Sequence, residues 1–167
     1  MAAQSGIGDA GRRGSDVRSD CWVSVEFPGP GGIELDLKSK VQSLFGGSIQ
    51  EGVRQTLSDL GIEECRVQLE DQGALPWVIQ ARLESAIRRA QGDLPGDARP
   101  PARPRPRAEG TQRDRVRRSR LYLPGNEPKF AINAGLHGPD GVILDLEDSV
   151  HPQEKDAARV VVRNALR

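Results

Sequence analysis

The sequence has only two cysteines and no long apolar run, and each shortage excludes a class of protein. Hydrophobic residues make up 36% of the 167 residues, which is low for one packed domain. No segment approaches the roughly 20 apolar residues of a membrane-spanning helix, and the first twenty residues lack the apolar centre of a signal peptide. The 24 basic and 24 acidic residues leave no net field. We therefore expect no membrane and no nucleic acid as partners.

Cys21 and Cys65 stand alone, without the Cys-x-x-Cys or Cys/His spacing of a zinc site. Two isolated cysteines in a chain without an export signal are most simply buried thiols in a reducing compartment. This pattern predicts a cytoplasmic protein.

Proline and arginine are concentrated in one segment. Residues 93–120 contain nine arginines and four acidic residues, a local charge of +5, together with five prolines that favour extended backbone. Because almost nothing apolar is available there to offset the entropy of ordering, we predict a Pro/Arg-rich linker over 93–115. An anion- or RNA-binding arm is the alternative, but it lacks interleaved aromatic residues. The chain thus divides into a disordered N-terminus (1–14), a first piece (15–92), the linker, and a second piece (116–167).

The first piece alternates between strand and helix patterns. Residues 21–27 and 33–37 have the two-residue period of half-buried strands, and the Pro/Gly-rich turn between them predicts a hairpin. Residues 65–70 form a third predicted strand. The pattern indicates a small α+β domain of roughly 75 residues, near the lower limit for a self-sufficient core. The predicted helices cover 41–45, ending at Gly46-Gly47; 48–60, capped by Ser48; and 75–87, with Pro76 in the first turn.

The second piece has the pattern of parallel strands and covering helices. Residues 121–123 and 141–146 are short apolar runs, as expected for strands buried on both faces. Helical patterns follow each run, at 127–134 and 152–166. Strand–helix–strand–helix is how an α/β barrel begins, so we predict the first two βα units of an incomplete TIM-type barrel.

Particular segments carry a family resemblance. The first piece resembles the acyl carrier protein, or γ subunit, of citrate lyase, most clearly through Glu70–Leu75 and Val78–Glu84. The second piece resembles the citrate lyase β subunit, in the HpcH/HpaI aldolase/citrate lyase family, through Pro124–Asn126, Asp145–Val150 and Glu154–Arg159.

The resemblance implies a chemistry and a set of partners. In this family the γ subunit bears a covalent 2'-(5''-phosphoribosyl)-3'-dephospho-CoA group on a serine. The thiol of that group carries acetyl and citryl groups while citrate is cleaved to acetate and oxaloacetate. The β subunit performs the cleavage with Mg²⁺. The implied partners are the citrate lyase α and β subunits, the prosthetic-group transferase and the acetyl ligase.

Two serines compete for the attachment site. The family pattern places the serine a fixed distance after Ala-Gly, and counting from Ala10-Gly11 selects Ser15. Counting back from the strand that follows Asp20 selects Ser19. We favour Ser19, because a strand fixes position better than an N-terminal segment does, and keep Ser15 as the alternative.

The resemblance also assigns roles in the second piece. Glu147 and Asp148 follow a predicted barrel strand, at the face where such enzymes work, and are expected in the metal neighbourhood. The expected contacts with the phosphates of the carrier arm are Arg117, Pro124, Gly125 and Asn126. No complete catalytic set is expected within these 167 residues.

Two other functions stay open. A malonate decarboxylase-type carrier would use the same prosthetic group, although the Asp-Leu-Glu-Asp segment at 145–148 points to carbon–carbon lyase chemistry. A non-catalytic adaptor would use the basic linker to dock a partner. A prosthetic group on a serine would exclude the adaptor.

Overall fold

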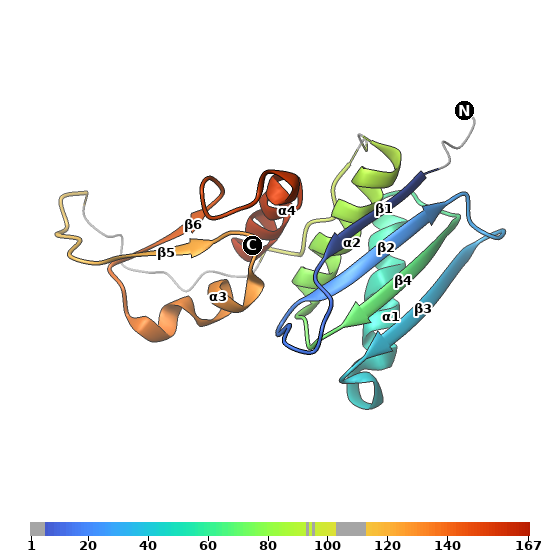
Figure 1. The fold of residues 1–167 in the computed structure, drawn as a ribbon, viewed down its shortest axis with the longest axis horizontal. Helices are drawn as coiled ribbons and strands as arrows, with labels where there is room; N and C mark the ends of the chain where they lie inside the picture. Colours follow the sequence, from blue (N-terminus) through green and yellow to red (C-terminus); the bar gives the residue numbers. More distant parts are fainter. Residues whose placement is uncertain (1–5, 93, 95, 103–112) are drawn as a thin grey trace.

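The computed structural model describes residues 6–92, 94, 96–102 and 113–167, which form two sheets and their covering helices (Figure 1). In chain order the elements are β1 (Gly6–Gly11), β2 (Cys21–Phe27), β3 (Ile33–Ser39), α1 (Gln42–Asp59), β4 (Cys65–Asp71), α2 (Pro76–Gln91), β5 (Arg120–Pro124), α3 (Pro128–Asn133), the 3-10 turn η1 (Ala134–His137), β6 (Gly141–Asp145), the 3-10 turn η2 (Pro152–Glu154) and α4 (Lys155–Ala165). The larger sheet has the order β1-β2-β4-β3, and the smaller one pairs β5 with β6 in parallel. Helices α1 and α2 cover one face of the larger sheet, and α4 packs on α2.

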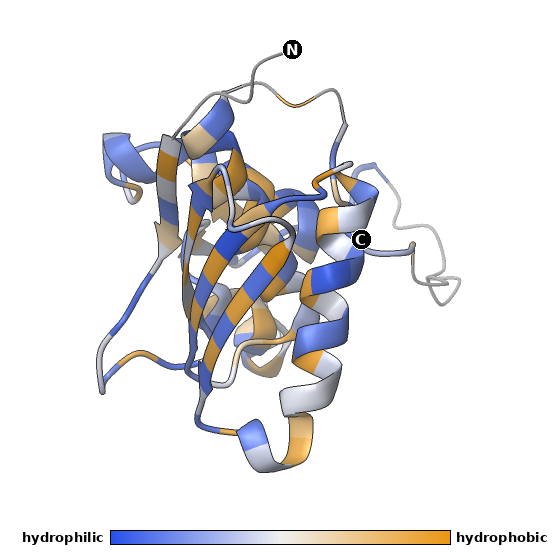
Figure 2. Cartoon of the chain, turned by 90° about the vertical axis from the view of Figure 1, so that its right-hand side faces the viewer, coloured by the Kyte–Doolittle hydropathy of each residue, from blue (hydrophilic) through white to orange (hydrophobic). Residues whose placement is uncertain are grey.

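The predicted alternation of the strands is confirmed. Val23, Val25, Val67 and Leu69 are at most 1% exposed and form the core between the sheet and its two helices. The residues between them carry polar side chains toward the open face, so orange and blue alternate along the strands in Figure 2. One buried and one exposed face is the arrangement that a two-residue period encodes.

The predicted hairpin is wrong. β2 and β3 do not pair with each other, because β4 lies between them, antiparallel to β2 and parallel to β3. The 28–32 turn crosses the beginning of β4, where the Cys65 amide donates to the Gly32 carbonyl at 3.1 Å. A Cβ on Gly29 would lie 2.6 Å from the Cys65 nitrogen, so the crossing needs glycine there. Alternation reports which face a strand buries and does not report its neighbour.

Two further differences concern β1 and α1. Residues 6–11, expected within a disordered N-terminus, form β1 as an edge strand antiparallel to β2. The two helices predicted on either side of Gly46-Gly47 are one continuous helix, and the Ser48 hydroxyl donates to the Phe45 carbonyl instead of capping a new start. Two glycines cost the helix about 1 kcal/mol each, which burial of Ile49 and Val53 offsets.

The second piece forms the two predicted βα units, and the described residues contain no barrel. Ala157, Ala158 and Val161 of α4 are buried, and Ala157 joins the core of the first piece. The predicted linker is only partly described. Residues 93, 95 and 103–112 lie outside the described residues, while Ala98 is buried beside α2.

Both cysteines are buried, as predicted. Burial raises the pKa of Cys65 to about 11, and burial together with the neighbouring Asp20 raises the pKa of Cys21 well above its usual range. Within the part of the chain that the structure describes, no helix is long and apolar enough to cross a membrane.

Candidate functional site

Both candidate serines lie on one loop, residues 12–20, which joins β1 to β2. The two strands pair up to Gly11 opposite Trp22, and the Arg12 amide then donates to the Cys21 carbonyl at 3.1 Å, which closes the base of the loop. Gly11 has a φ of +94°, and a Cβ there would lie 1.9 Å from the Cys21 carbonyl oxygen. A glycine is therefore required where the loop leaves the sheet.

Ser15 and Ser19 have different surroundings. Ser15 is exposed in a turn in which the Val17 amide donates to the Gly14 carbonyl at 3.4 Å. Ser19 is half-buried, and its amide donates to the Gln72 carbonyl at 3.2 Å. Among the described residues it alone combines a side chain with a positive φ, +55°, a conformation that costs a non-glycine residue about 1–2 kcal/mol. The hydrogen bond to Gln72 thus ties Ser19 to the end of β4, while Ser15 is exposed to solvent.

A buried ion pair anchors the end of the loop. The Arg82 guanidinium on α2 donates to both carboxylate oxygens of Asp20, at 3.0 and 2.8 Å, and the two side chains are 1% and 4% exposed. Burial alone lowers the pKa of Arg82, but its hydrogen bonds and charge interaction with Asp20 raise it overall. The Cys21 amide is a further donor to Asp20, at 2.9 Å.

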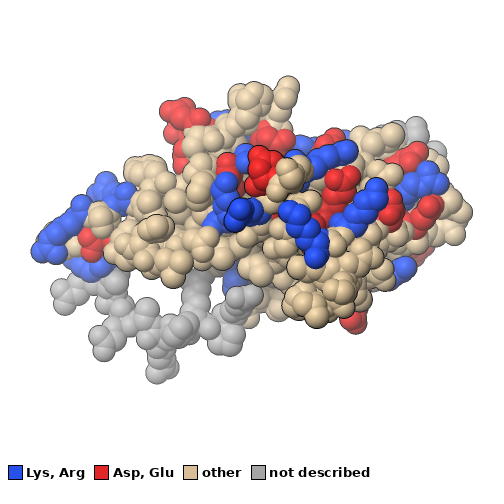
Figure 3. Space-filling model, turned by 60° about the horizontal axis from the view of Figure 1, so that its bottom comes forward, with Lys and Arg blue, Asp and Glu red and all other residues tan. Residues whose placement is uncertain are grey.

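A cavity of about 320 Å³ opens beside the loop, between the two pieces of the chain. Arg12 from the loop and Lys129 from α3 both contact Glu127, at 2.9 and 3.1 Å. Although partial burial raises the pKa of Glu127, its hydrogen bonds with these two cations lower it overall. Charged side chains of both signs are mixed over the face of the molecule that Figure 3 shows. The charged residues lining the cavity are Arg12, Arg13, Arg18, Lys129, Asp16, Asp20 and Glu127.

The predicted arm contacts divide into two groups. The Asn126 carbonyl accepts a 2.8 Å hydrogen bond from Arg82, so the Pro124–Asn126 turn reaches the anchor of the serine loop. Gly125 is required in that turn, because a Cβ would lie 2.7 Å from the Asp145 carbonyl oxygen. Arg117 lies elsewhere, exposed and donating to carbonyls of its own segment.

Glu147 and Asp148 follow β6 and are exposed. Asp145 organises this segment by accepting hydrogen bonds from the amides of Glu147 and Ser149, at 2.9 and 3.1 Å. Hydrogen bonds from Ser149 and Glu147 lower the pKa of Asp145. Over residues 6–92, 94, 96–102 and 113–167 no group of three or more His, Cys, Asp or Glu is arranged to hold a metal. The metal role of Glu147 and Asp148 stays a prediction.

The central residue that sequence reasoning missed is Arg82. Ile79, Leu83 and Ala86 define the inward stripe of α2, and Arg82 falls on that stripe at the helical spacing. A charged residue in an apolar stripe is the signal for a buried partner, because a lone buried charge is too costly. Asp20 supplies the partner, 62 residues away.

The junction retains unused hydrogen-bonding capacity. Among the described residues, three buried side-chain atoms have no partner: Arg82 Nη1, Asn126 Oδ1 and Gln72 Oε1. All three residues belong to the Ser19–Asp20 surroundings. With Arg12, Arg13 and Arg18 on the same loop, the residues present fit a phosphate-bearing group attached to a loop serine.

Two protein families match separate parts of this chain. Residues 10–90 match the family described as malonate decarboxylase delta subunit (MdcD), and residues 118–167 match the HpcH/HpaI aldolase/citrate lyase family. The citrate lyase acyl carrier protein of Fusobacterium nucleatum is 39% identical over 80 residues, which cover 48% of this chain and 85% of that protein. That of Clostridium perfringens is 43% identical over 72 residues, 43% of this chain and 71% of that protein. Citrate lyase acyl carrier protein 2 of Salmonella typhimurium is 39% identical over 72 residues, 43% of this chain and 74% of that protein.

Proposed function

This chain belongs, through residues 10–90, to the citrate lyase acyl carrier protein family, and we propose that it carries acyl groups on a prosthetic arm during citrate cleavage. We call residues 10–90 the carrier module and residues 118–167 the lyase module. The observation that carries the proposal is the loop 12–20. In this loop the exposed Ser15 lies among arginines, within the part of the chain that matches the family.

The arm is a phosphoribosyl-dephospho-CoA group joined to a serine oxygen, and when bound it supplies a thiol that forms thioesters with acetyl and citryl groups. The residues of this chain hold and orient it. The cations of the loop neutralise its phosphates, and the buried Asp20–Arg82 pair fixes the end of the loop. Tethering raises the local concentration of the acyl group at each partner site.

The attachment point is one of two serines. Ser19 is favoured by its fixed distance from the strand, because it precedes Asp20 and β2 directly. The exposure of Ser15 at the tip of a turn favours Ser15, because a transferase must reach the hydroxyl oxygen. Accessibility is the stronger requirement for an enzymatic modification, so we propose Ser15 as the first candidate and Ser19 as the second.

The lyase module is proposed to contribute the first two βα units of a barrel. Glu147 and Asp148 would then lie near a Mg²⁺ ion at the carboxyl end of β6, and the Pro124–Asn126 turn would face the phosphates of the arm. The predicted contact of Arg117 with those phosphates does not belong to this arrangement, because Arg117 precedes β5, at the other end of that strand. The carrier module is not catalytic alone. Cleavage therefore requires the α and β subunits of citrate lyase, and loading requires a transferase and an acetyl ligase.

A malonate decarboxylase carrier is the second candidate, because the family that residues 10–90 match is named after the delta subunit of that enzyme. The named relatives and the aldolase/citrate lyase match of residues 118–167 favour citrate.

The test is oxaloacetate release from the acetylated chain with citrate and Mg²⁺, with and without added citrate lyase α and β subunits. We expect release only with both subunits, and the chain with Ser15 and Ser19 both replaced by Ala to be inactive in their presence. Release by the chain alone would contradict the assignment of cleavage to the β subunit. Exchange of malonate but not citrate would select the second candidate.

A further inference from the structure

The two parallel strands of the lyase module present one chemically distinctive edge. β5 and β6 pair in register with Pro124 opposite Asp145, so their carboxyl ends coincide. The turn after β5 and the acidic segment after β6 both leave from this edge. In α/β barrels the loops at the carboxyl ends of the strands form the active face.

The serine loop meets this same edge. Arg12 contacts Glu127 at 2.9 Å, and Arg82 joins Asp20 to the Asn126 carbonyl, with 2.8 Å to each. These contacts link the base and the end of the loop to the turn that follows β5. A group attached to the loop therefore starts beside the carboxyl edge of the lyase module.

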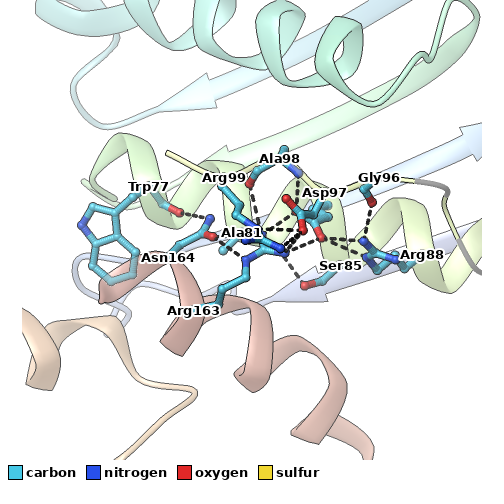
Figure 4. A network of polar contacts seen from close by, with 11 residues as sticks. Trp77, Ala81, Ser85, Arg88, Gly96, Asp97, Ala98, Arg99, Arg163 and Asn164 are labelled. Carbon is cyan, nitrogen blue, oxygen red and sulfur yellow. Dashed lines mark hydrogen bonds and ion pairs between the residues drawn. The ribbon is translucent and has the colours of Figure 1, made fainter. Parts of the chain in front are cut away.

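An interface on α2 holds the two modules in this relation. Glu84 of α2 has a fully buried carboxylate, and Arg163 of α4 donates to both of its oxygens, at 3.0 and 2.7 Å (Figure 4). Arg88 and the Ala98 amide donate to the same carboxylate, each at 2.9 Å. Without Arg163 the buried carboxylate would keep only Arg88 and the Ala98 amide, so a helix without a cation at this position would satisfy it less well.

A second ion pair joins α4 to α2 near the other end of α4. Arg89 donates to both oxygens of Asp156, at 2.8 and 2.7 Å, and to the carbonyl oxygens of Gln153 and Asp9. Its guanidinium thus links α4, the turn η2 and strand β1. Hydrogen bonding to Asp156 raises the pKa of Arg89 overall, although partial burial opposes it. Two ion pairs at separate points fix both the position and the direction of α4.

We propose that the face of α2 bearing Glu84 and Arg89 is the docking surface of the carrier for a lyase of the aldolase/citrate lyase type, filled here by the lyase module of the same chain. The surface recognises the helix after the second barrel strand through Arg163 and Asp156. Docking in this orientation places the arm-bearing loop at the carboxyl edge of β5 and β6, where the acyl group is delivered. The delivery rests on the proposed function; the docking contact does not.

The test uses the complete, unmodified chain and a charge exchange across the interface. In E84R and in R163E, hydrogen exchange of α4 amides should accelerate at least roughly tenfold, because E84R places a third cation beside Arg88 and Arg163, and R163E places a second carboxylate against the buried one of Glu84. The double variant E84R/R163E re-forms the pair with reversed polarity, with Arg88 beside the new cation, and should recover part of the protection that the worse single variant loses. R159E is the matched control, since Arg159 lies on α4 with the same charge and is exposed. Amides of β2 and β4 report whether the carrier module itself stays folded.

Two outcomes overturn the docking surface: R163E behaving as R159E does, or a double variant no better than the worse single variant. If E84R unfolds the carrier module, the comparison of α4 hydrogen exchange in R163E with that in R159E still tests the docking surface. A carbodiimide crosslink in R12K to Glu127 tests the alignment, and its yield should fall severalfold when R163E is added. An unchanged yield contradicts the alignment. If the serine is never modified but the hydrogen-exchange results for the charge variants are as expected, only the proposed function is refuted. If the serine is modified but those hydrogen-exchange results are not obtained, only the docking surface is refuted.

Discussion

Replacing Arg82 with methionine should be among the most destabilising single changes in the chain. The guanidinium and its partner Asp20 are 1% and 4% exposed, so the substitution leaves a carboxylate buried without its cation. Breaking a buried pair by removing one partner costs about 3–5 kcal/mol. The same change removes the donor to the Asn126 carbonyl. For a chain of this size, with a urea m-value of about 1–3 kcal/mol/M, the unfolding midpoint should fall by at least about 1 M.

Urea unfolding followed by tryptophan fluorescence measures this effect, and the chain supplies a matched control. Arg66 pairs with Glu34 at 3.1 Å on the open face of the sheet, where the two side chains are 44% and 52% exposed. R66M should therefore cost less than about 1 kcal/mol. In the double variant D20N/R82M the loss should be smaller than the sum of the two single losses, because no unpaired charge remains. An R82M midpoint equal to that of R66M would refute the reasoning.

The remaining predictions concern stability at acid pH, strand β1 and helix α1. Hydrogen bonding to Arg89 lowers the pKa of Asp156 below 3.8, so this pair stabilises the chain above that value and is lost as pH falls through the lowered pKa. Unfolding midpoints measured from neutral pH to below pH 4 should fall less in D156N, and equal falls would contradict the linkage. A Cβ on Gly8 would lie 2.2 Å from a carbonyl oxygen of α2, so G8A should release β1 and destabilise the chain by about 1–3 kcal/mol. G47A, with open space around the new methyl group, should instead stabilise α1 by about 0.5–1 kcal/mol; thermal unfolding of both variants checks the opposite signs.

The sequence patterns identified the segments that form strands and helices. They were less successful in predicting which strands pair with each other. Period-two alternation located β2, β3 and β4 and their inward faces. It could not place β4 between the other two, because the order of strands depends on contacts between residues distant in the chain. β1 was missed for a different reason. Its glycines carry no hydrophobic signal, although Gly8 allows α2 to lie close against the strand.

The candidate site was predicted in part. The loop with Ser15 and Ser19 and the Pro124–Asn126 turn were identified from the family resemblance, and the structure brings them together through Arg82. That junction depends on an ion pair whose partners are 62 residues apart, which no local pattern encodes. The packing of α4 on α2 was likewise not predicted, because its apolar face has the same signature whether it covers a barrel strand or another helix.

The most direct test of the carrier assignment is the mass of the peptide spanning loop 12–20 after co-expression with the prosthetic-group transferase. We predict one added phosphoribosyl-dephospho-CoA group on this peptide, kept in S19A and lost in S15A, with both variants still folded. Retention in S15A and loss in S19A would move the attachment point to Ser19 without changing the function. A peptide of unmodified mass in the presence of an active transferase would contradict the assignment of this chain as an acyl carrier.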